Sequence, residues 1–316
     1  MKEGKMIKVA VIGLGKMGLL HASLLRVLPG VRLVALCDKS GLIRRVCKQM
    51  FKDVFITDDV EKFVGLGLEA VYVTTPIPSH FSVVKKICSL NLSSNLFVEK
   101  TLATNYNDAK EMCMLAQRIG GVNMVGYMKR FAVTFIKGKE LLNKGAIGEV
   151  SSFDAYAYSS DFVNIKTGAI AGSRGGVLGD LGSHVFDLAL WYFGDLKINF
   201  AKLKSWSSEA EDEASAEVSC SGRVQGRFDV SWCKEGFRMP EIGITIQGTK
   251  GSIRVTDDDV RLELNDGKIY RWFRHDLNDS VSFLLGASEY FREDKHFIES
   301  ILNGKCAEPD FLTAAK

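Results

Sequence analysis

The stretch Ile7-Lys-Val-Ala-Val-Ile-Gly13-Leu-Gly15-Lys-Met-Gly18-Leu-Leu-His21 decides the fold of this chain. An apolar run typical of a strand breaks at the first glycine, and after the third glycine apolar residues return with helical spacing. In the pattern Gly-x-Gly-x-x-Gly, the first glycine permits a tight turn and the second lets the backbone approach a pyrophosphate. The third lets the helix pack closely on the strand. The stretch therefore predicts a strand, a turn and a helix that bind a dinucleotide.

A second apolar run, Val31–Cys37, ends on Asp38, twenty residues after Gly18. Folds with this glycine pattern place a carboxylate there to accept hydrogen bonds from ribose hydroxyls. The alternative is a structural turn followed by a surface aspartate, because a chain with 30 glycines can produce the spacing by chance. The carboxylate favours NAD because it would repel the 2′-phosphate of NADP. Arg44 and Arg45 follow within reach of such a phosphate, so NADP stays an alternative.

Length and composition indicate a globular protein of two domains, with 316 residues of which 46% are hydrophobic and 25% charged. The net charge of +3 comes from scattered basic residues, which does not indicate nucleic-acid binding. The seven cysteines form no Cys-x-x-Cys pair and indicate buried thiols in a reducing compartment. No apolar stretch approaches the length of a membrane span. We therefore expect a cytoplasmic protein with no nucleic-acid or membrane partner.

Strands and helices alternate as far as residue 125 and predict a doubly wound parallel sheet. The pattern then changes to a helix over 130–144, a half-buried strand over 149–159 and an apolar helix that ends at 193. Seven β runs follow, over 197–206, 214–220, 224–232, 242–247, 251–255, 260–264 and 268–272. We expect an α/β chain with a dinucleotide-binding domain over 1–125. Residues 126–316 should form an α+β domain with a large open, mainly antiparallel sheet. A helix over 288–302 could pack on either domain, and 310–316 looks like a helix cut short, so we expect the natural protein to continue.

Four features stand in the same order as in a known family. They are the glycine pattern, Thr74-Thr-Pro76 with His80, Glu99-Lys100, and Gly175-Gly-Val-Leu-Gly-Asp180-Leu-Gly-Ser-His184-Val-Phe-Asp187. The chain thereby resembles the Gfo/Idh/MocA family, oxidoreductases related to glucose-fructose oxidoreductase and inositol dehydrogenase. Further matches are Gly126-Tyr127 before Arg130-Phe131 and the segment Gly248-Thr-Lys-Gly-Ser252, so the resemblance covers nearly the whole chain. Thr101 stands where relatives usually have proline.

The resemblance implies NAD(P)-dependent hydride transfer at a secondary alcohol or ketone. The substrate would be a sugar, a sugar derivative such as a nucleotide-sugar, or a cyclic polyol. Lys100, Asp180 and His184 would be catalytic. A lysine at a strand end can stabilise negative charge on a substrate oxygen, and an imidazole that titrates near neutral pH can accept the hydroxyl proton. The plainer alternatives are an ion pair between Lys100 and Glu99, and a core histidine at position 184.

The remaining site residues also follow from the resemblance. The cofactor-binding set is Gly13, Leu14, Gly15, Lys16, Met17, Gly18, Asp38, Lys39, Thr74, Thr75, Pro76, His80, Glu99 and Lys100. The substrate-binding set is Tyr127, Arg130, Lys166, Asp180 and His184. His80 could cap its helix or contact nicotinamide. Asp180 lies four residues before His184, on the same face of a helix, but no third His or Cys stands at ligand spacing, so no metal site is expected.

Two alternatives remain to sugar oxidation. A minority of relatives reduce non-sugar substrates such as a dihydrodiol or a linear tetrapyrrole of the biliverdin type, and the same glycine loop could serve a non-catalytic NAD sensor. The coexistence of Lys100, Asp180 and His184 argues against the sensor. An open sheet that carries Trp and Phe residues commonly associates with its copy, so we expect a homodimer or homotetramer through the C-terminal sheet.

Overall fold

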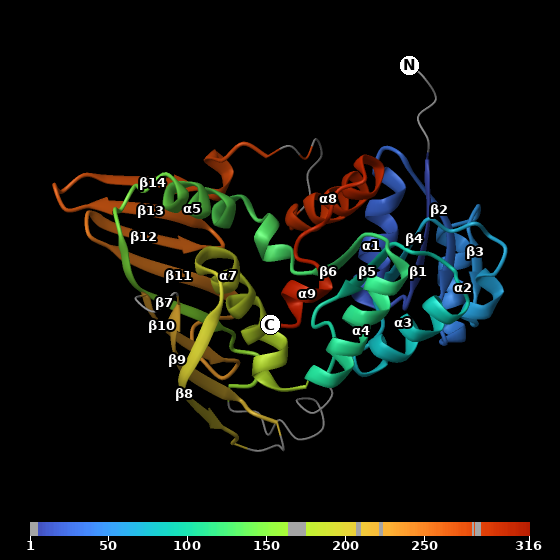
Figure 1. Cartoon of the computed structure of the whole chain (residues 1–316), viewed down its shortest axis with the longest axis horizontal. Helices are drawn as coiled ribbons and strands as arrows, with labels where there is room; N and C mark the ends of the chain where they lie inside the picture. The colour runs from blue at the N-terminus through green and yellow to red at the C-terminus, as the bar shows by residue number, and fades with distance from the viewer. Residues whose placement is uncertain (1–5, 164–174, 207–209, 221–223, 280, 282–285) are drawn as a thin grey trace. The chain divides into compact units, whose positions relative to one another are not determined.

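The computed structural model describes residues 6–163, 175–206, 210–220, 224–279, 281 and 286–316. The chain folds into two compact units (Figure 1). The first runs to Tyr127 and takes in Tyr290–Lys316, and the second is Met128–Glu289.

The first unit is built on a six-stranded parallel sheet in the order β3-β2-β1-β4-β5-β6. Its strands are β1 (Ile7–Ile12), β2 (Val31–Cys37), β3 (Phe55–Thr57), β4 (Ala70–Val73), β5 (Leu96–Glu99) and β6 (Asn123–Gly126). The strand order reverses between β1 and β4, and ligands of such sheets bind beside the carboxyl ends of the strands at this point. This arrangement confirms the predicted doubly wound sheet.

Helices cover both faces of this sheet. They are α1 (Lys16–Val27), α2 (Gly41–Met50), α3 (His80–Ser89), α4 (Tyr106–Ile119), α8 (Glu289–Asn303) and α9 (Phe311–Ala314). Helices α3, α4 and α9 share an apolar core with alternate residues of β1, β4 and β5. On the opposite face, Phe297 of α8 packs edge-on against Tyr72 of β4, with ring centroids 5.5 Å apart.

The C-terminal segment differs from the sequence prediction, which assigned all of 126–316 to one domain. Residues 290–316 pack in the first unit instead. Phe311 is fully buried in the core beside α4, and its backbone N–H donates to Asn123 Oδ1 at 2.8 Å. The parallel sheet thus covers the apolar face of α8. Amphipathic spacing alone did not show which domain this helix packs on.

The second unit contains an eight-stranded sheet in the order β14-β13-β12-β11-β7-β10-β9-β8. Its strands are β7 (Val150–Tyr158), β8 (Leu196–Lys204), β9 (Glu213–Cys220), β10 (Val224–Ser231), β11 (Glu241–Gly248), β12 (Gly251–Thr256), β13 (Asp259–Leu264) and β14 (Ile269–Phe273). Strands β7 and β10 pair in parallel, and the other pairs are antiparallel. The predicted mainly antiparallel sheet is therefore confirmed.

Helices α5 (Val133–Asn143) and α7 (Ser183–Phe193) share an apolar core with this sheet. The predicted helix over 130–144 is wrong at its start, because a 3-10 turn over Met128–Phe131 precedes α5 and Ala132 between them is extended. Lys166, predicted to bind substrate, lies outside the described residues. In the part of the chain that the structure describes, no helix is long and apolar enough to cross a membrane.

Candidate active site

The glycine loop joins β1 to α1 in a conformation that its glycines make possible. Gly13 has φ +94°, and a Cβ there would lie 2.6 Å from the backbone nitrogen of Thr75. A Cβ on Gly18 would lie 1.8 Å from the Gly13 carbonyl oxygen. The Thr74 hydroxyl donates to that same carbonyl at 2.6 Å. The first and third glycines therefore allow the loop, α1 and the end of β4 to pack in direct contact.

The amino end of α1 is suited to bind an anion. Gly15 precedes the helix, no side chain caps it, and its first turn holds no acidic residue. No protein atom lies within 4 Å of where a Cβ on Gly15 would stand. The helix dipole and free amides attract phosphate at such an end, so this part of the loop fits the pyrophosphate of NAD.

Asp38 follows β2 at the same edge of the sheet. Its carboxylate accepts the N–H of Leu14 at 2.6 Å and the N–H of Ser40 at 2.7 Å. Each carboxylate oxygen has further lone pairs, so Asp38 is oriented by the glycine loop and can still accept hydroxyl groups. Arg44 donates to the backbone oxygens of Asp38 and Lys39, each at 2.8 Å. The guanidinium is thus already engaged in hydrogen bonds beside Asp38.

The ring of His80 lies between two loops that follow strands of the parallel sheet. Its side chain is fully buried, with Nε2 2.8 Å from the Thr75 oxygen and Nδ1 3.0 Å from the Thr101 oxygen. Burial lowers the pKa of His80, against the smaller opposing effect of these backbone oxygens. Its ring therefore links the loop after β4 to the loop after β5.

Lys100 is half-buried and directly follows β5, at the carboxyl edge of the parallel sheet. The peptide bond between Lys100 and Thr101 is cis. Glu99, which was predicted to bind cofactor, is buried. Its Oε2 accepts the backbone N–H of Lys100 at 2.9 Å, and its Oε1 lies 2.9 Å from His21 Nε2. The Glu99 carboxylate therefore contacts His21 and the backbone of Lys100, both within the first unit.

Asp180 and His184 lie in one continuous helical segment of the second unit. Asp180 belongs to a π-helical turn over Leu178–Gly182, and His184 lies in the first turn of α7, with 6% of its surface exposed. Glu211 fixes this turn, because its carboxylate accepts the N–H of Leu178 at 3.0 Å. Single π turns inside helices often occur at functional sites, since they redirect side chains.

Arg130 and Tyr127, both predicted to bind substrate, are buried. The Arg130 guanidinium donates to both oxygens of Asp187, with Nη2 2.7 Å and Nε 2.8 Å away. Asp187 is on α7, three residues after His184, so this pair anchors the helix that carries His184. Tyr127 lies in the apolar core of the first unit with 5% exposed. The Arg130 guanidinium is thus engaged with Asp187 in the second unit, and the Tyr127 ring packs in the core of the first.

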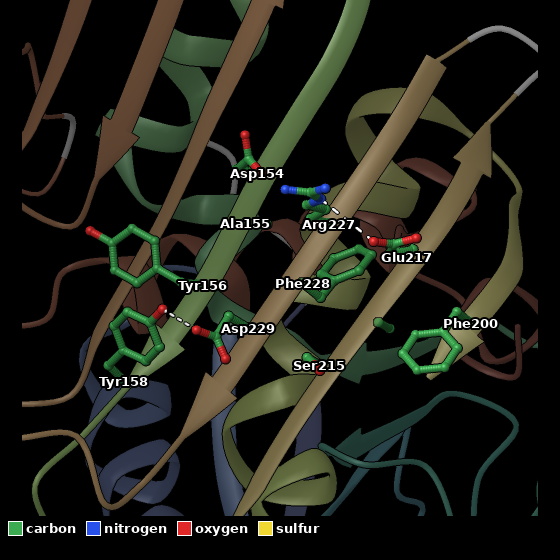
Figure 2. Close-up of a pocket in the computed structure, with 11 residues that line it drawn as sticks. Asp154, Ala155, Tyr156, Tyr158, Phe200, Ser215, Glu217, Arg227, Phe228 and Asp229 are labelled. Carbon is green, nitrogen blue, oxygen red and sulfur yellow. Dashed lines mark hydrogen bonds and ion pairs between the residues drawn. The ribbon is translucent and has the colours of Figure 1, made fainter. Parts of the chain in front are cut away.

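A hollow of about 390 Å³ lies on the eight-stranded sheet of the second unit, beside strands β7, β9 and β10 (Figure 2). Tyr156 and Tyr158 of β7 stack there at 4.8 Å, and Tyr158 donates to Asp229 at 2.7 Å. Side chains alternate across a strand, and Phe153 and Ala155 of β7 face the core that α7 shares. The hollow therefore opens on the face opposite α7, and we do not assign catalysis to it.

Sequence reasoning missed the partners of these side chains. Asp187, Glu211 and Asp294 are acidic residues in ordinary helical or loop sequence, and only the fold brings each to its partner. The spacing of Asp187 three residues after His184 was the one available signal, since it places both on neighbouring positions of one helix.

Comparisons with known proteins identify both domains. Residues 7–127 match the family described as "Oxidoreductase family, NAD-binding Rossmann fold", and residues 135–254 match the GFO/IDH/MocA C-terminal domain. Scyllo-inositol 2-dehydrogenase (NAD(+)) of Bacillus subtilis is 26% identical over 60% of this chain and 54% of its own length. D-apiose dehydrogenase of Paraburkholderia graminis is 26% identical over 83% of this chain and 70% of its own length.

The fold is also found in solved structures. Levoglucosan dehydrogenase in complex with NADH and levoglucosan is similar with a TM-score of 0.86, 18% identity, and coverage of 98% of this chain and 94% of that one. The chain spans little more than half the length of the first inositol dehydrogenases that it matches. The two matched domains and the glycine loop between β1 and α1 lead to one conclusion: this chain is an NAD-binding oxidoreductase of the Gfo/Idh/MocA family.

Proposed function

We propose that the chain transfers a hydride between NAD and a secondary alcohol or ketone of a sugar, a sugar derivative or a cyclic polyol. The observation that carries this proposal is the position of Lys100. It follows β5 at the carboxyl edge of the sheet, the same edge at which the glycine loop and Asp38 follow β1 and β2. The sugar and polyol dehydrogenases among its relatives support the substrate class.

In this proposal His184 accepts the hydroxyl proton of the substrate, and Lys100 stabilises the charge that develops on the same oxygen. Asp180 holds the substrate or the imidazole in place. NAD, when bound, supplies the hydride acceptor. The Arg130–Asp187 pair keeps α7, and with it His184, in a fixed position. The proposed site thus contains a base, His184, and a cationic group, Lys100.

We propose NAD as the preferred cofactor, with NADP as the alternative. Asp38 is oriented by two backbone N–H groups and would repel a 2′-phosphate. Arg44 could bind that phosphate only by giving up its hydrogen bonds to Asp38 and Lys39. Both observations favour NAD.

We assign cofactor binding to the first unit, and substrate binding and self-association to the second. The edge strand β8 supports association, because Ile198, Phe200 and Leu203 are 64%, 56% and 55% exposed. A homodimer or homotetramer through this sheet would cover them. The seven cysteines are free thiols, which supports a cytoplasmic location.

The test is NADH formation from NAD⁺ with a panel of inositols, aldoses, glycosides, nucleotide-sugars and a cyclic cis-diol. Lys100→Ala and His184→Asn should each lower kcat by about 10²- to 10⁴-fold. Matched controls are Lys110→Ala on α4 and His275→Asn, because both side chains are exposed. The controls should keep wild-type kcat.

Two outcomes would contradict the proposal. If both site variants turn over substrate at the wild-type rate, the catalytic assignment is wrong. If NAD raises the unfolding temperature, as a ligand of the folded state must, but no substrate is oxidised or reduced, the chain is an NAD sensor.

A further inference from the structure

A buried charged cluster includes Glu99, the residue that precedes Lys100. His21 of α1 is 2.8 Å from Asp294 Oδ1 through Nδ1 and 2.9 Å from Glu99 Oε1 through Nε2. His21 and Asp294 are fully buried, and Glu99 is 8% exposed. All three belong to the first unit, because the chain returns to that unit at Tyr290 and α8 carries Asp294. The cluster takes no part in the proposed chemistry.

Two carboxyl groups at hydrogen-bond distance, one on each ring nitrogen, favour a doubly protonated ring. A neutral imidazole has a single N–H and could donate to only one of the two carboxylates, whereas an imidazolium donates to both. Burial opposes the charged ring, but Asp294 and then Glu99 outweigh burial and raise the pKa of His21 well above its usual value. Among the described residues, the groups next to the ring include the phenols Tyr72 of β4 and Tyr290 of α8, and Glu293 of α8, near Tyr72, is a buried carboxyl group.

Glu99 transmits this arrangement to the lysine. Its Oε1 faces the imidazole, and its Oε2 accepts the backbone N–H of Lys100. On the other side of Lys100, the buried ring of His80 lies 3.0 Å from the Thr101 carbonyl oxygen. The backbone that carries Lys100 is thus held from both sides by buried histidines, one of them through a carboxylate.

We propose that His21 is a positioning residue for Lys100: its imidazolium, held between Asp294 and Glu99, fixes the Glu99 carboxylate on the Lys100 amide and so places the lysine side chain. Part of this inference, the effect on turnover, rests on the function proposed above. A side chain without charge at position 21 would leave two buried carboxylates facing each other, and Glu99 would then turn away or take up a proton. Either change releases the Lys100 amide.

The variants are His21→Phe and Asp294→Asn, and the control is Phe297→Leu. Phe297 packs against Tyr72 and Phe97, the rings that also flank His21, with centroids 5.5 and 5.7 Å apart. The control therefore disturbs the same core layer without an ionisable group. Asp294→Asn keeps an acceptor for the ring but removes its charge, and it serves if His21→Phe does not fold.

Two measurements use the full chain without substrate. Proton–nitrogen NMR spectra at neutral pH should show two N–H groups on His21, and a single N–H would overturn the proposal. After reductive methylation with ¹³C-formaldehyde, the Lys100 signal, identified by its loss in Lys100→Arg, should shift in His21→Phe and Asp294→Asn but not in Phe297→Leu. An unchanged Lys100 signal in both cluster variants would also overturn the proposal.

Turnover supplies the third measurement. Misplacement by about 1 Å can cost about 100-fold in rate, so kcat should fall by about that factor in both cluster variants while the NADH dissociation constant stays near wild type. Phe297→Leu should lower the unfolding temperature but keep kcat. Equal losses of kcat in Phe297→Leu and His21→Phe would mean that His21 is merely structural. If the wild type turns over nothing but the Lys100 signal still shifts, the proposed function fails and the positioning role stands.

Discussion

A side chain added at Gly18 should affect folding, whereas one added at Gly15 of the same loop should affect cofactor binding. A Cβ on Gly18 would lie 1.8 Å from the Gly13 carbonyl oxygen and 2.7 Å from the Thr74 hydroxyl, whereas a Cβ on Gly15 would have no protein atom within 4 Å. Gly15 is also extended, with φ −65° and ψ −168°, which any residue can adopt. Gly18→Ala should therefore impair folding, and Gly15→Val should impair cofactor binding.

The cost of Gly18→Ala follows from the overlap. The Gly13 carbonyl oxygen would have to move from 1.8 Å to at least 3.0 Å from the new methyl group. Overpacking costs about 1–3 kcal/mol, and loss of the hydrogen bond from Thr74 adds about 1 kcal/mol. A total of about 3 kcal/mol should lower the unfolding temperature by about 6–12 °C in a unit of this size.

Gly15→Val should change the free energy of unfolding by no more than about 1 kcal/mol. Valine is a poorer residue than glycine before a helix, and the lower entropy of the unfolded chain partly compensates. The cofactor loses more. Each charge-assisted hydrogen bond to the pyrophosphate contributes about 1.5–3 kcal/mol, so losing two weakens binding by about 10²- to 10⁴-fold.

Thermal unfolding without cofactor and calorimetric titration with NADH separate the two effects. Gly18→Ala should unfold early, and Gly15→Val should unfold near the wild-type temperature yet bind NADH weakly. Wild-type affinity in Gly15→Val would mean that residues 13–18 form an ordinary turn. Wild-type stability in Gly18→Ala would refute the close packing of the loop on α1.

Three further predictions follow from single contacts. Asp38→Ser should narrow the preference for NADH over NADPH in equilibrium titrations, and tighter NADPH binding by the wild type would contradict the NAD assignment. Arg130→Met removes the guanidinium that donates to both oxygens of buried Asp187, which should cost about 3–5 kcal/mol in denaturant unfolding, whereas Arg130→Met with Asp187→Leu should recover most of that loss. Because the pKa of His21 is raised on folding, its contribution is complete below about pH 6.5 and declines as pH rises. Most thiols titrate above pH 8. From pH 6.5 to 8, the free energy of unfolding in denaturant titrations should therefore fall more steeply in the wild type than in His21→Phe.

Local patterns were sufficient to predict most of the fold. The seven β runs after residue 195 all correspond to strands of the second sheet, because alternation and turn residues act within a few positions. The glycine loop and Asp38 were predictable for the same reason, since their spacing reflects one strand–turn–helix unit. The start of α5 was not, because the 3-10 turn at Met128–Phe131 leaves no distinct signal in composition.

The site was less predictable where a charged residue has a distant partner. Arg130 and Asp187 are 57 positions apart, and His21 and Asp294 are 273 apart. A sequence does not distinguish an arginine that faces a substrate from one that is buried against a carboxylate, because both occur in similar local surroundings. Arg130, Tyr127, Glu99 and His80 were thus predicted to bind ligands, and all four are buried.

These buried charges have a common relation to the predicted catalytic residues. Glu99, held by His21, immediately precedes Lys100, and Asp187, held by Arg130, lies three residues after His184. A buried ion pair is weak evidence for stability, because its desolvation cost rivals its attraction and apolar replacements are often neutral or stabilising. What such a pair does supply is direction, since a bidentate or doubly held carboxylate permits few orientations. Each unit therefore contains a charged support for a predicted catalytic residue, and loss of that support should lower turnover as well as stability.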